Sequence, residues 1–405
     1  MGTGHPAGGP RRAAGGLRPP ATVAEVLRAG LHAGGGATLG PHQRKVLGAI
    51  LACGTAELGG HRYRCEDCGA EHFVPHSCRN RHCPRCQRHL AEAWLAREQE
   101  NLLPVPYFHV VFTLPHALNA LIRQNRAALY RLLFASASAT LLEFGRQRFG
   151  GQVGITAVLH TWGQDLCEHY HLHCLVTAGA LSDDRRRFRR GSARYLFAVR
   201  ALSVVFQAKF RDGLWALQRA GKLRFSGPLA PLAKPGVFAG LMRQALAKPW
   251  SVYAKRPFAG PAQVLAYLSR YTHRVAIGSG RIRALDLAAQ TVTFRYKDYA
   301  DHHRQRDMTL GTAEFLRRFC LHILPARFVK IRHYGLRGNH QRKAKLAAAR
   351  AALERQGARL PRADAGDAPP APAAAGGSPI PRCPRCGSVH LRLLKHLLPG
   401  RLDSS

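Results

Sequence analysis

The segment EHYHLH at residues 168–173 places three histidines at alternate positions, His169, His171 and His173. On a β-strand, residues i, i+2 and i+4 share one face, so this spacing directs three imidazoles the same way. Imidazole is a common ligand for divalent metals, and two or three on one face can share an ion if another ligand lies nearby. An ordinary strand with a polar face would also accommodate the pattern, so the rest of the chain must decide between the two interpretations.

The cysteines form a second group of possible metal ligands. Seven of them fall at positions 65, 68, 78, 83, 86, 383 and 386, and the pairs Cys65-x2-Cys68 and Cys83-x2-Cys86 are separated by fourteen residues. Two such pairs at this separation are typical of a tetrahedral zinc site with four thiolates. Because every ligand comes from the protein, the predicted site is structural and not catalytic. The predicted zinc ligands are Cys65, Cys68, Cys83 and Cys86, and Cys78, His72, His76 and His82 are additional donors that could replace a thiolate or build a second site.

The pair Cys383 and Cys386 in CPRCG resembles half of a zinc site at the end of the chain. Two thiolates cannot complete a tetrahedral site. The pair could therefore bind weakly, borrow a donor such as His390, or be a vestige.

A further pattern, VLAYLSRYTHR at residues 264–274, contains Tyr267 and Tyr271. Residues four apart lie on the same helix face in successive turns. Two core tyrosines of an amphipathic helix would explain this spacing. However, Arg270, His273 and Arg274 surround them, and since a core helix rarely carries so much charge, a surface that faces phosphates is favoured.

The composition indicates a polyanionic partner. Lys plus Arg is 61 and Asp plus Glu is 23, which gives a formal net charge of +38. DNA or RNA is the leading explanation for such an excess, and Arg79, Arg81 and Arg85 in RNRHCPRCQRH are candidate phosphate contacts. No apolar stretch of about 18 residues is present to span a bilayer, and the N-terminus lacks the apolar region of a secretory signal. We therefore expect a cytoplasmic protein with no membrane partner.

The elements that must position these residues can be read from apolar periodicity. YFHVVFTL at 107–114 indicates a buried strand, and residues 154–162 and 170–181 indicate two strands of a hairpin. Helical spacing recurs within 21–60, 90–103, 119–149, 198–221, 261–276, 312–324 and 341–355. The order strand, helix, strand, strand predicts an α+β fold, an antiparallel sheet with covering helices.

Composition and apolar spacing along the chain indicate five regions. They are a disordered N-terminus at 1–20, a helical and zinc-binding domain at 21–100, a domain with the sheet at 101–300, a basic helical region at 301–360, and a linker with the CPRC tail at 361–405.

Four motifs in one order, SCRNRHCPRCQ, HTWGQDL, HYHLHCLVTAGAL and YLSRYTHRVAI, resemble the rolling-circle insertion-sequence transposases. This is the HUH two-tyrosine type with an N-terminal zinc-binding domain, and the resemblance covers about residues 40–340. It implies an HUH endonuclease-like palm for residues 101–300, and an enzyme that nicks and rejoins single-stranded DNA at transposon ends through a 5′-phosphotyrosine. It also implies a catalytic Mg²⁺ or Mn²⁺ beside the structural Zn²⁺, the bacterial nucleoid as location, and host replication or helicase proteins as partners.

Applied to this chain, the resemblance implies that His171 and His173 hold the catalytic metal and that Tyr267 and Tyr271 are the nucleophiles. His169 would be a supporting group. His160 and Gln164 on the neighbouring strand are candidates for a third ligand, with Gln164 slightly preferred because it lies nearer the turn.

Two other functions remain to be tested against this prediction. A non-catalytic zinc-ribbon DNA-binding protein would use the same basic surface, with histidines and tyrosines that only pack. An inactive transposase remnant would retain the motifs without activity.

Overall fold

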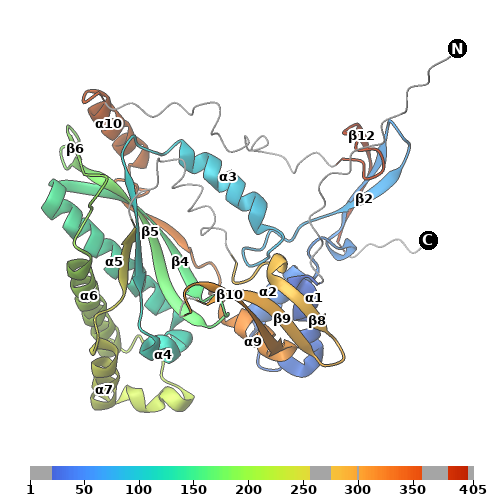
Figure 1. Ribbon diagram of the computed structural model, residues 1–405, viewed down its shortest axis with the longest axis horizontal. Coiled ribbons are helices and arrows are strands. Elements are labelled where there is room, and N and C mark those ends of the chain that lie inside the picture. Colours follow the sequence, from blue (N-terminus) through green and yellow to red (C-terminus); the bar gives the residue numbers. More distant parts are fainter. Residues whose placement is uncertain (1–20, 256–274, 299–300, 358–381, 400–405) are drawn as a thin grey trace.

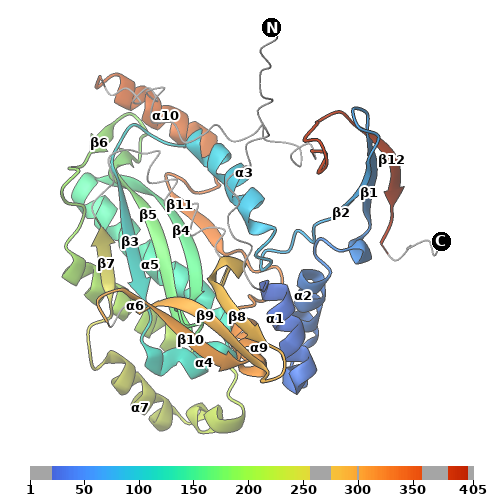
Figure 2. The ribbon, with the colours of Figure 1, turned by 45° about the vertical axis from the view of Figure 1, so that its right-hand side comes forward.

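The computed structural model describes residues 21–255, 275–298, 301–357 and 382–399. Its largest sheet is antiparallel and has the strand order β11-β4-β5-β3-β7, with β6 paired to β5 (Figures 1 and 2). The strands are β3 (Tyr107–Thr113), β4 (Gly151–Trp162), β5 (Glu168–Ser182), β6 (Phe188–Arg190), β7 (Val252–Lys255) and β11 (Ile331–Gly335).

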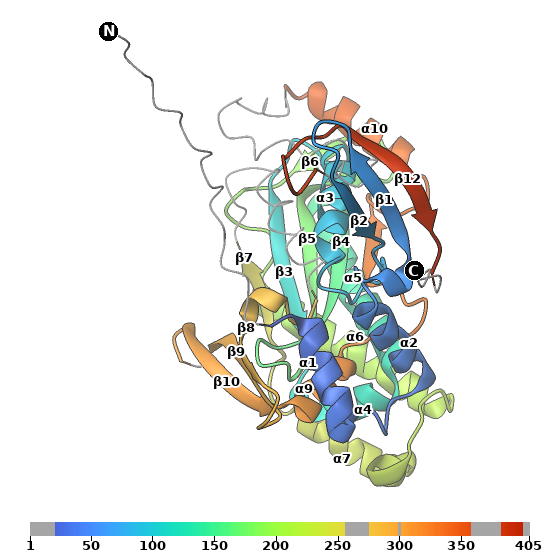
Figure 3. The same cartoon turned by 90° about the vertical axis from the view of Figure 1, so that its right-hand side faces the viewer.

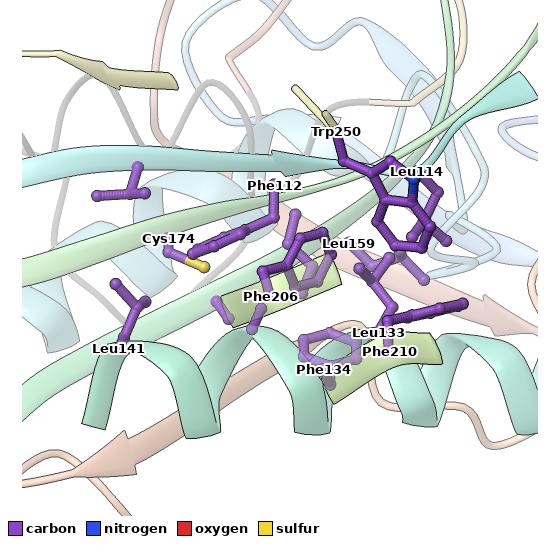
Figure 4. Packing of buried hydrophobic residues seen from close by; sticks show 14 of the residues in the cluster. Phe112, Leu114, Leu133, Phe134, Leu141, Leu159, Cys174, Phe206, Phe210 and Trp250 are labelled. Carbon is purple, nitrogen blue, oxygen red and sulfur yellow. The ribbon is translucent and has the colours of Figure 1, made fainter. Parts of the chain in front are cut away.

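Four helices lie against one face of this sheet or its rim. They are α4 (Asn119–Gln124), α5 (Arg126–Phe149), α6 (Val199–Arg219) and α7 (Pro235–Leu246). Figure 4 shows Phe112, Leu159 and Cys174 of the sheet facing side chains of α5 and α6. α5 is long and apolar enough to cross a membrane by length and composition, but half of its most apolar window is buried inside the protein, as expected for a core helix. It ends at Gly150, whose φ of 58° lies in the left-handed region that glycine adopts at low cost.

Of the residues that the structure describes, two helices cover part of the opposite face of the sheet. α3 (Gln87–Gln99) and α10 (Arg342–Glu354) pack there on Tyr107, Leu175 and other apolar residues. A buried ion pair between Glu98 of α3 and Arg337 also joins this helix to the segment that follows β11. The remainder of this face carries the histidines of EHYHLH.

A second hydrophobic core joins the beginning of the chain to its later part. It lies between α1 (Val23–Gly30), α2 (Pro41–Leu51), the small sheet β8-β9-β10 and α9 (Thr312–Leu321). The sheet consists of β8 (Ile282–Asp286), β9 (Thr291–Asp298) and β10 (Arg304–Gly311). α1 begins in a capping box, in which Thr22 Oγ1 accepts from the Glu25 backbone N–H and Glu25 accepts from that of Thr22. This core therefore combines the predicted zinc-binding region with segments about 250 residues later in the chain.

A third, three-stranded sheet has the order β12-β1-β2; it lies to one side of the rest in Figures 1 and 2 and faces the viewer in Figure 3. β1 (Gly60–Cys65) and β2 (Glu71–Pro75) form a hairpin, and β12 (Leu391–Leu397) comes from the end of the chain. Short helical turns complete the described elements at Leu31–Gly35, Ala56–Leu58, His116–Leu118, Gly227–Ala233 and Ser279–Arg281.

The α+β class and the antiparallel sheet with covering helices are confirmed. The hairpin of 154–162 and 170–181 is present as β4 and β5, each somewhat longer than predicted. The sequence did not reveal eight strands, which are short or largely exposed: β1, β2, β6, β7, β8, β10, β11 and β12. The predicted helix at 261–276 lies almost entirely outside the described residues.

Candidate metal centres

The first candidate centre is a cluster of three histidines, His160, His171 and His173, on the partly covered face of the large sheet. His160 on β4 is the direct cross-strand partner of His171 on β5. Strand alternation sends Leu172 and Cys174 into the core beneath α5 and leaves His171 and His173 on the other face. One nitrogen from each imidazole lies within 4.8 Å of the other two, so the three can hold one metal ion.

The hydrogen bonds of these rings suit metal binding. His171 Nδ1 lies 3.0 Å from the carbonyl oxygen of His169, to which it donates, so His171 Nε2 keeps its lone pair. That atom faces His173 Nε2 at 3.0 Å. Two nitrogens bound to one ion at about 2.1 Å lie roughly 3 Å apart when the two bonds are near perpendicular. The separation of these two atoms therefore matches that of two nitrogens that share one ion.

His109 on β3 extends the cluster. Its Nε2 lies 2.8 Å from His173 Nδ1, and the two rings stack with centroids 5.0 Å apart. A partner at the far nitrogen of a ligating imidazole sets its tautomer and orientation. We did not single out His109 from the sequence, because it lies within an apolar run and has no histidine neighbour in the chain. Only the pairing of β3 with β5 brings it to His173.

Burial keeps these imidazoles neutral, which is the form that binds metal. Removal from water, with a smaller contribution from the neighbouring His169, lowers the pKa of His171 to about 3. Removal from water, with a smaller contribution from Lys255, lowers the pKa of His109 to about 4.

The structure distinguishes the two candidates for a third ligand. His160 lies in the cluster, 3% exposed, with its ring against that of His173. Gln164 lies in the turn beyond Trp162, the last paired residue of β4, where its carbonyl oxygen accepts a hydrogen bond from Arg281. Nearness to the turn thus places Gln164 outside the paired region of the two strands, and His160 is the candidate that lies among the histidines. His169 lies beside the cluster, with its ring near those of His171 and His116.

The predicted nucleophiles Tyr267 and Tyr271 lie outside the described residues, as do Arg270, His273 and Arg274. The residues on either side of that segment are described. β7 ends at Lys255, which pairs with His109. Val275 lines a small pocket together with Trp162, whose ring stacks on that of His160 at 4.7 Å. Both ends of the tyrosine segment thus join the fold beside the histidine cluster.

The second candidate centre consists of four cysteines, Cys53, Cys78, Cys83 and Cys86. Cys86 Sγ lies 3.6 Å from the sulfurs of both Cys53 and Cys78. Four thiolates at about 2.3 Å from a zinc ion would lie about 3.8 Å from one another, so the spacing suits tetrahedral zinc. The backbone N–H groups of Cys78 and Asn80 donate to the sulfurs of Cys53 and Cys78, which stabilises thiolate character.

The third candidate centre joins Cys65 and Cys68 to Cys383 and Cys386. Cys65 Sγ lies 3.5 Å from Cys386 Sγ, and Cys68 Sγ lies 3.6 Å from Cys383 Sγ. Each Cys-x2-Cys pair belongs to the same kind of turn. The glycine after each pair has a positive φ, 69° for Gly69 and 78° for Gly387. Its backbone N–H donates to the carbonyl oxygen of the first cysteine of the pair, Cys65 or Cys383. The turn requires a left-handed residue there, which explains the glycine that follows both pairs.

The predicted grouping of the zinc ligands was therefore wrong. Cys65 and Cys68 do not share a site with Cys83 and Cys86, because each pair has its own two partners. Spacing along the chain identified both pairs but could not show which thiolates complete them. Cys53 was missed, since it stands alone in ILACG with no second cysteine nearby. Cys383 and Cys386 are half of a site, as the sequence indicated, and the other half is in β1 and the turn after it.

The additional histidine donors separate in a similar way. His76 meets His61 and His396 at the other end of the β12 sheet. His82 accepts a hydrogen bond from the Leu324 backbone N–H, and burial lowers its pKa to about 3. His72 packs on Tyr63. None of the three belongs to either cysteine cluster.

The three arginines proposed as phosphate contacts have different surroundings. Arg81 donates to the carbonyl oxygens of Phe328 and Pro325, which ties the cysteine turn to that segment. Arg85 donates to the Cys53 carbonyl at 2.7 Å. Arg79 is exposed. Arg85 is exposed as well, whereas Arg81 is half-buried.

Comparison with known families agrees with this combination of a zinc-binding region and an α+β core. Residues 154–345 match a family model described as "Putative transposase", and residues 25–114 match one described as "Transposase zinc-binding domain". The first range contains the histidine cluster except His109. The second contains every cysteine from Cys53 to Cys86 and ends before Cys383 and Cys386. These features define the class of the protein, an insertion-sequence transposase with a zinc-binding domain.

Two curated relatives extend over most of the chain. One is "Putative transposase y4qJ" of Sinorhizobium fredii, 44% identical over 77% of this chain and 79% of its own length. Another is "Transposase for insertion sequence element IS801" of Pseudomonas savastanoi pv. phaseolicola, 31% identical over 72% of this chain and 69% of its own. No solved structure matches the chain significantly. The chain belongs to the IS91 family of transposases, as the order of its motifs predicted. Membership implies DNA as the partner, and DNA cleavage and strand transfer as the activity.

Proposed function

We propose that this transposase nicks and rejoins single-stranded DNA at transposon ends through a 5′-phosphotyrosine intermediate, in rolling-circle transposition. Tyr267 and Tyr271 are the nucleophiles, and His160, His171 and His173 hold one divalent cation. The observation that carries the proposal is the position of the histidine cluster. It lies on the partly covered face of the sheet, next to both described ends of the segment that contains the tyrosines.

The reaction is a balanced exchange of phosphodiester bonds. A tyrosine oxygen attacks phosphorus, the bond to the 3′ oxygen breaks, and the products are a 5′-phosphotyrosine and a free 3′-hydroxyl. The new ester preserves the energy of the old bond, so rejoining needs no ATP. The second tyrosine allows a second strand to be attacked while the first end stays attached.

A phenol with an ordinary pKa of about 10 is a poor nucleophile at neutral pH. A divalent cation in the cluster would stabilise the charge that develops on the phosphate. The chain's own contribution is to keep His171 neutral by burial and to orient His173 through His109. Three imidazoles suit Mn²⁺ better than Mg²⁺, which prefers oxygen ligands. We therefore expect higher activity with Mn²⁺.

The two cysteine clusters have a structural role in this proposal, with one Zn²⁺ in each. All of their ligands come from the protein, and one of the clusters joins Cys65 and Cys68 to Cys383 and Cys386 near the other end of the chain. Cys53, Cys78, Cys83 and Cys86 lie in the core that contains α1 and α9. A zinc ion bound by these four cysteines would stabilise the region that packs against the large sheet.

The test is a nicking assay on labelled single-stranded oligonucleotides that carry the transposon end, with Mn²⁺, Mg²⁺ or chelator. We expect cleavage and a covalent protein–DNA adduct only with metal. His171→Ala and His173→Ala should each remove nicking while DNA binding falls much less, since affinity for a polyanion comes chiefly from Arg and Lys. His169→Ala should be milder. The matched control is His116→Ala, which removes an exposed neighbour of His169 outside the cluster.

The same assay separates the alternatives. A non-catalytic DNA-binding protein or an inactive remnant would bind the oligonucleotide but form no adduct under any metal condition. If His169→Ala abolished nicking and His171→Ala did not, the ligands would have been assigned to the wrong histidines.

A further inference from the structure

The C-terminal strand β12 is held by few apolar contacts. It pairs antiparallel with β1 from Gly60↔Leu397 to Cys65↔Leu391. Its middle residues are exposed, and Leu393 is still 50% exposed. A short strand with so little burial gains little from the hydrophobic effect, and a small sheet of this kind is marginal alone. Another interaction must therefore hold the end of the chain in place.

Metal donors lie at both ends of this strand. The pair Cys383 and Cys386 precedes β12 and meets the cysteines at the end of β1. At the opposite end, His396 of β12 is the direct cross-strand partner of His61 of β1. His76, which follows β2, completes a group of three imidazoles whose ligand nitrogens lie within 4.8 Å of one another. The three strands of the sheet thus converge on this group.

The geometry of the three rings is that of a ligand set. His76 Nδ1 donates to the carbonyl oxygen of Leu58 at 3.1 Å, so its Nε2 keeps a lone pair. That atom faces His61 Nε2 at 3.2 Å. The ring of His396 stacks on that of His61 with centroids 4.8 Å apart. A ligating histidine usually donates its far N–H to a carbonyl or carboxylate, as His76 does here.

The arrangement repeats that of the nuclease cluster, which is the group of His160, His171 and His173 on the large sheet. There, the far nitrogen of His171 is also bonded to a backbone carbonyl, and its near nitrogen faces a second imidazole at 3.0 Å. The two groups are built on different sheets from unrelated segments. Their shared feature is that backbone contacts fix one ring so that its lone pair is directed at another ring.

We propose that His61, His76 and His396 bind one Zn²⁺ or a similar transition-metal ion, and that this ion holds the end of the C-terminal tail against the hairpin of β1 and β2. Imidazole donors suit such ions, and three protein ligands leave a fourth position for water. The tail is then fixed at both ends of β12, by a cysteine site and by a histidine site. This inference does not depend on the proposed nuclease chemistry.

The two sites should differ in strength. Four thiolates form a closed site, whereas three imidazoles and a water form an open one that exchanges more readily. His396 is itself exposed, which gives a chelator direct access. A mild chelator should therefore remove the histidine-bound ion first and leave both cysteine sites filled.

Metal content of the full chain tests the proposal. The variant is His396→Gln, an exposed position where the substitution does not endanger folding. The control is His390→Gln, another exposed tail histidine, which lies 3.2 Å from Asp67 and outside the group. Both are made in a His171→Ala/His173→Ala background so that the nuclease cluster contributes no ion. We expect His396→Gln to lose one equivalent of zinc relative to His390→Gln. Equal metal content in the two would overturn the site.

A second measurement tests the role in holding the tail. A protease recognition sequence is inserted between Gly376 and Gly377, and the purified chain is cleaved there. We expect the tail fragment to remain bound to the body of the protein and to leave when a chelator is added. In the absence of chelator, the fragment should dissociate faster from the His396→Gln chain than from the His390→Gln chain, because only the cysteine site then holds it. Equal dissociation rates from both, or immediate release from both, would refute the proposal that this ion fastens the tail.

Discussion

Replacement of His109 by leucine isolates the contact that orients His173. His109 is 6% exposed, and its Nε2 lies 2.8 Å from His173 Nδ1. Leucine keeps most of the buried volume but removes the hydrogen-bond partner. Loss of such an outer partner typically lowers metal affinity about ten- to a hundredfold, which corresponds to about 1.4 to 2.7 kcal/mol. The apparent affinity for Mn²⁺ should fall by that factor.

The assay is a Mn²⁺ titration, followed both by calorimetric binding and by oligonucleotide nicking. We expect the half-saturating Mn²⁺ concentration of His109→Leu to rise ten- to a hundredfold, with the nicking rate restored at saturation because the ligands themselves remain. His109→Gln, which can still accept or donate a hydrogen bond, should recover part of the affinity. His116→Leu is the matched control, since it removes an exposed imidazole beside His169. Unchanged Mn²⁺ affinity in His109→Leu would refute the argument.

Three further outcomes are expected. Tyr267→Phe or Tyr271→Phe should impair strand transfer, and the double variant should bind DNA but form no adduct that survives denaturant; such an adduct would contradict the assignment. Cys53→Ser should lose one zinc equivalent and much of the stability of the N-terminal region, whereas Cys174→Ser, at a buried cysteine outside both clusters, should retain full metal content. Burial lowers the pKa of His322 from 6.5 to about 4, so the unfolded chain takes up a proton first as the pH falls. Stability should therefore decrease between pH 6.5 and 4, by on the order of 3 kcal/mol for this group, and His322→Gln should flatten the dependence of the urea midpoint on pH.

The sequence was informative where a pattern acts within one element. The alternation of His169, His171 and His173 predicted a strand face, and β5 presents that face because Leu172 and Cys174 enter the core. The parity of His160 was also sufficient to suggest it as a ligand. The choice between His160 and Gln164 required the register of β4 against β5, which depends on where the turn begins. Local periodicity does not define that point to within two residues.

Local sequence patterns could not identify residues that reach a site only through the pairing of strands distant in the sequence. His109 belongs to an apolar strand, and its role follows only from the pairing of β3 with β5. β12 could not be recognised as a strand, because its apolar residues at 391, 393, 394 and 397 fit neither period clearly. What fixes β12 is the partner strand β1, which lies more than 300 residues earlier in the chain.

Counting the cysteines narrows their arrangement but does not determine it. Three Cys-x2-Cys pairs provide six thiolates, but two closed tetrahedral sites need eight. If the pairs at 65 and 83 shared one site, the pair at 383 would need two single cysteines to complete a site of its own. Division into two sites uses all three pairs only when two single cysteines join one of them, and Cys53 and Cys78 are those residues. The pair at the end of the chain therefore argues against a single N-terminal site, because its turn, with glycine in the left-handed region, is the same as that of the pair it meets.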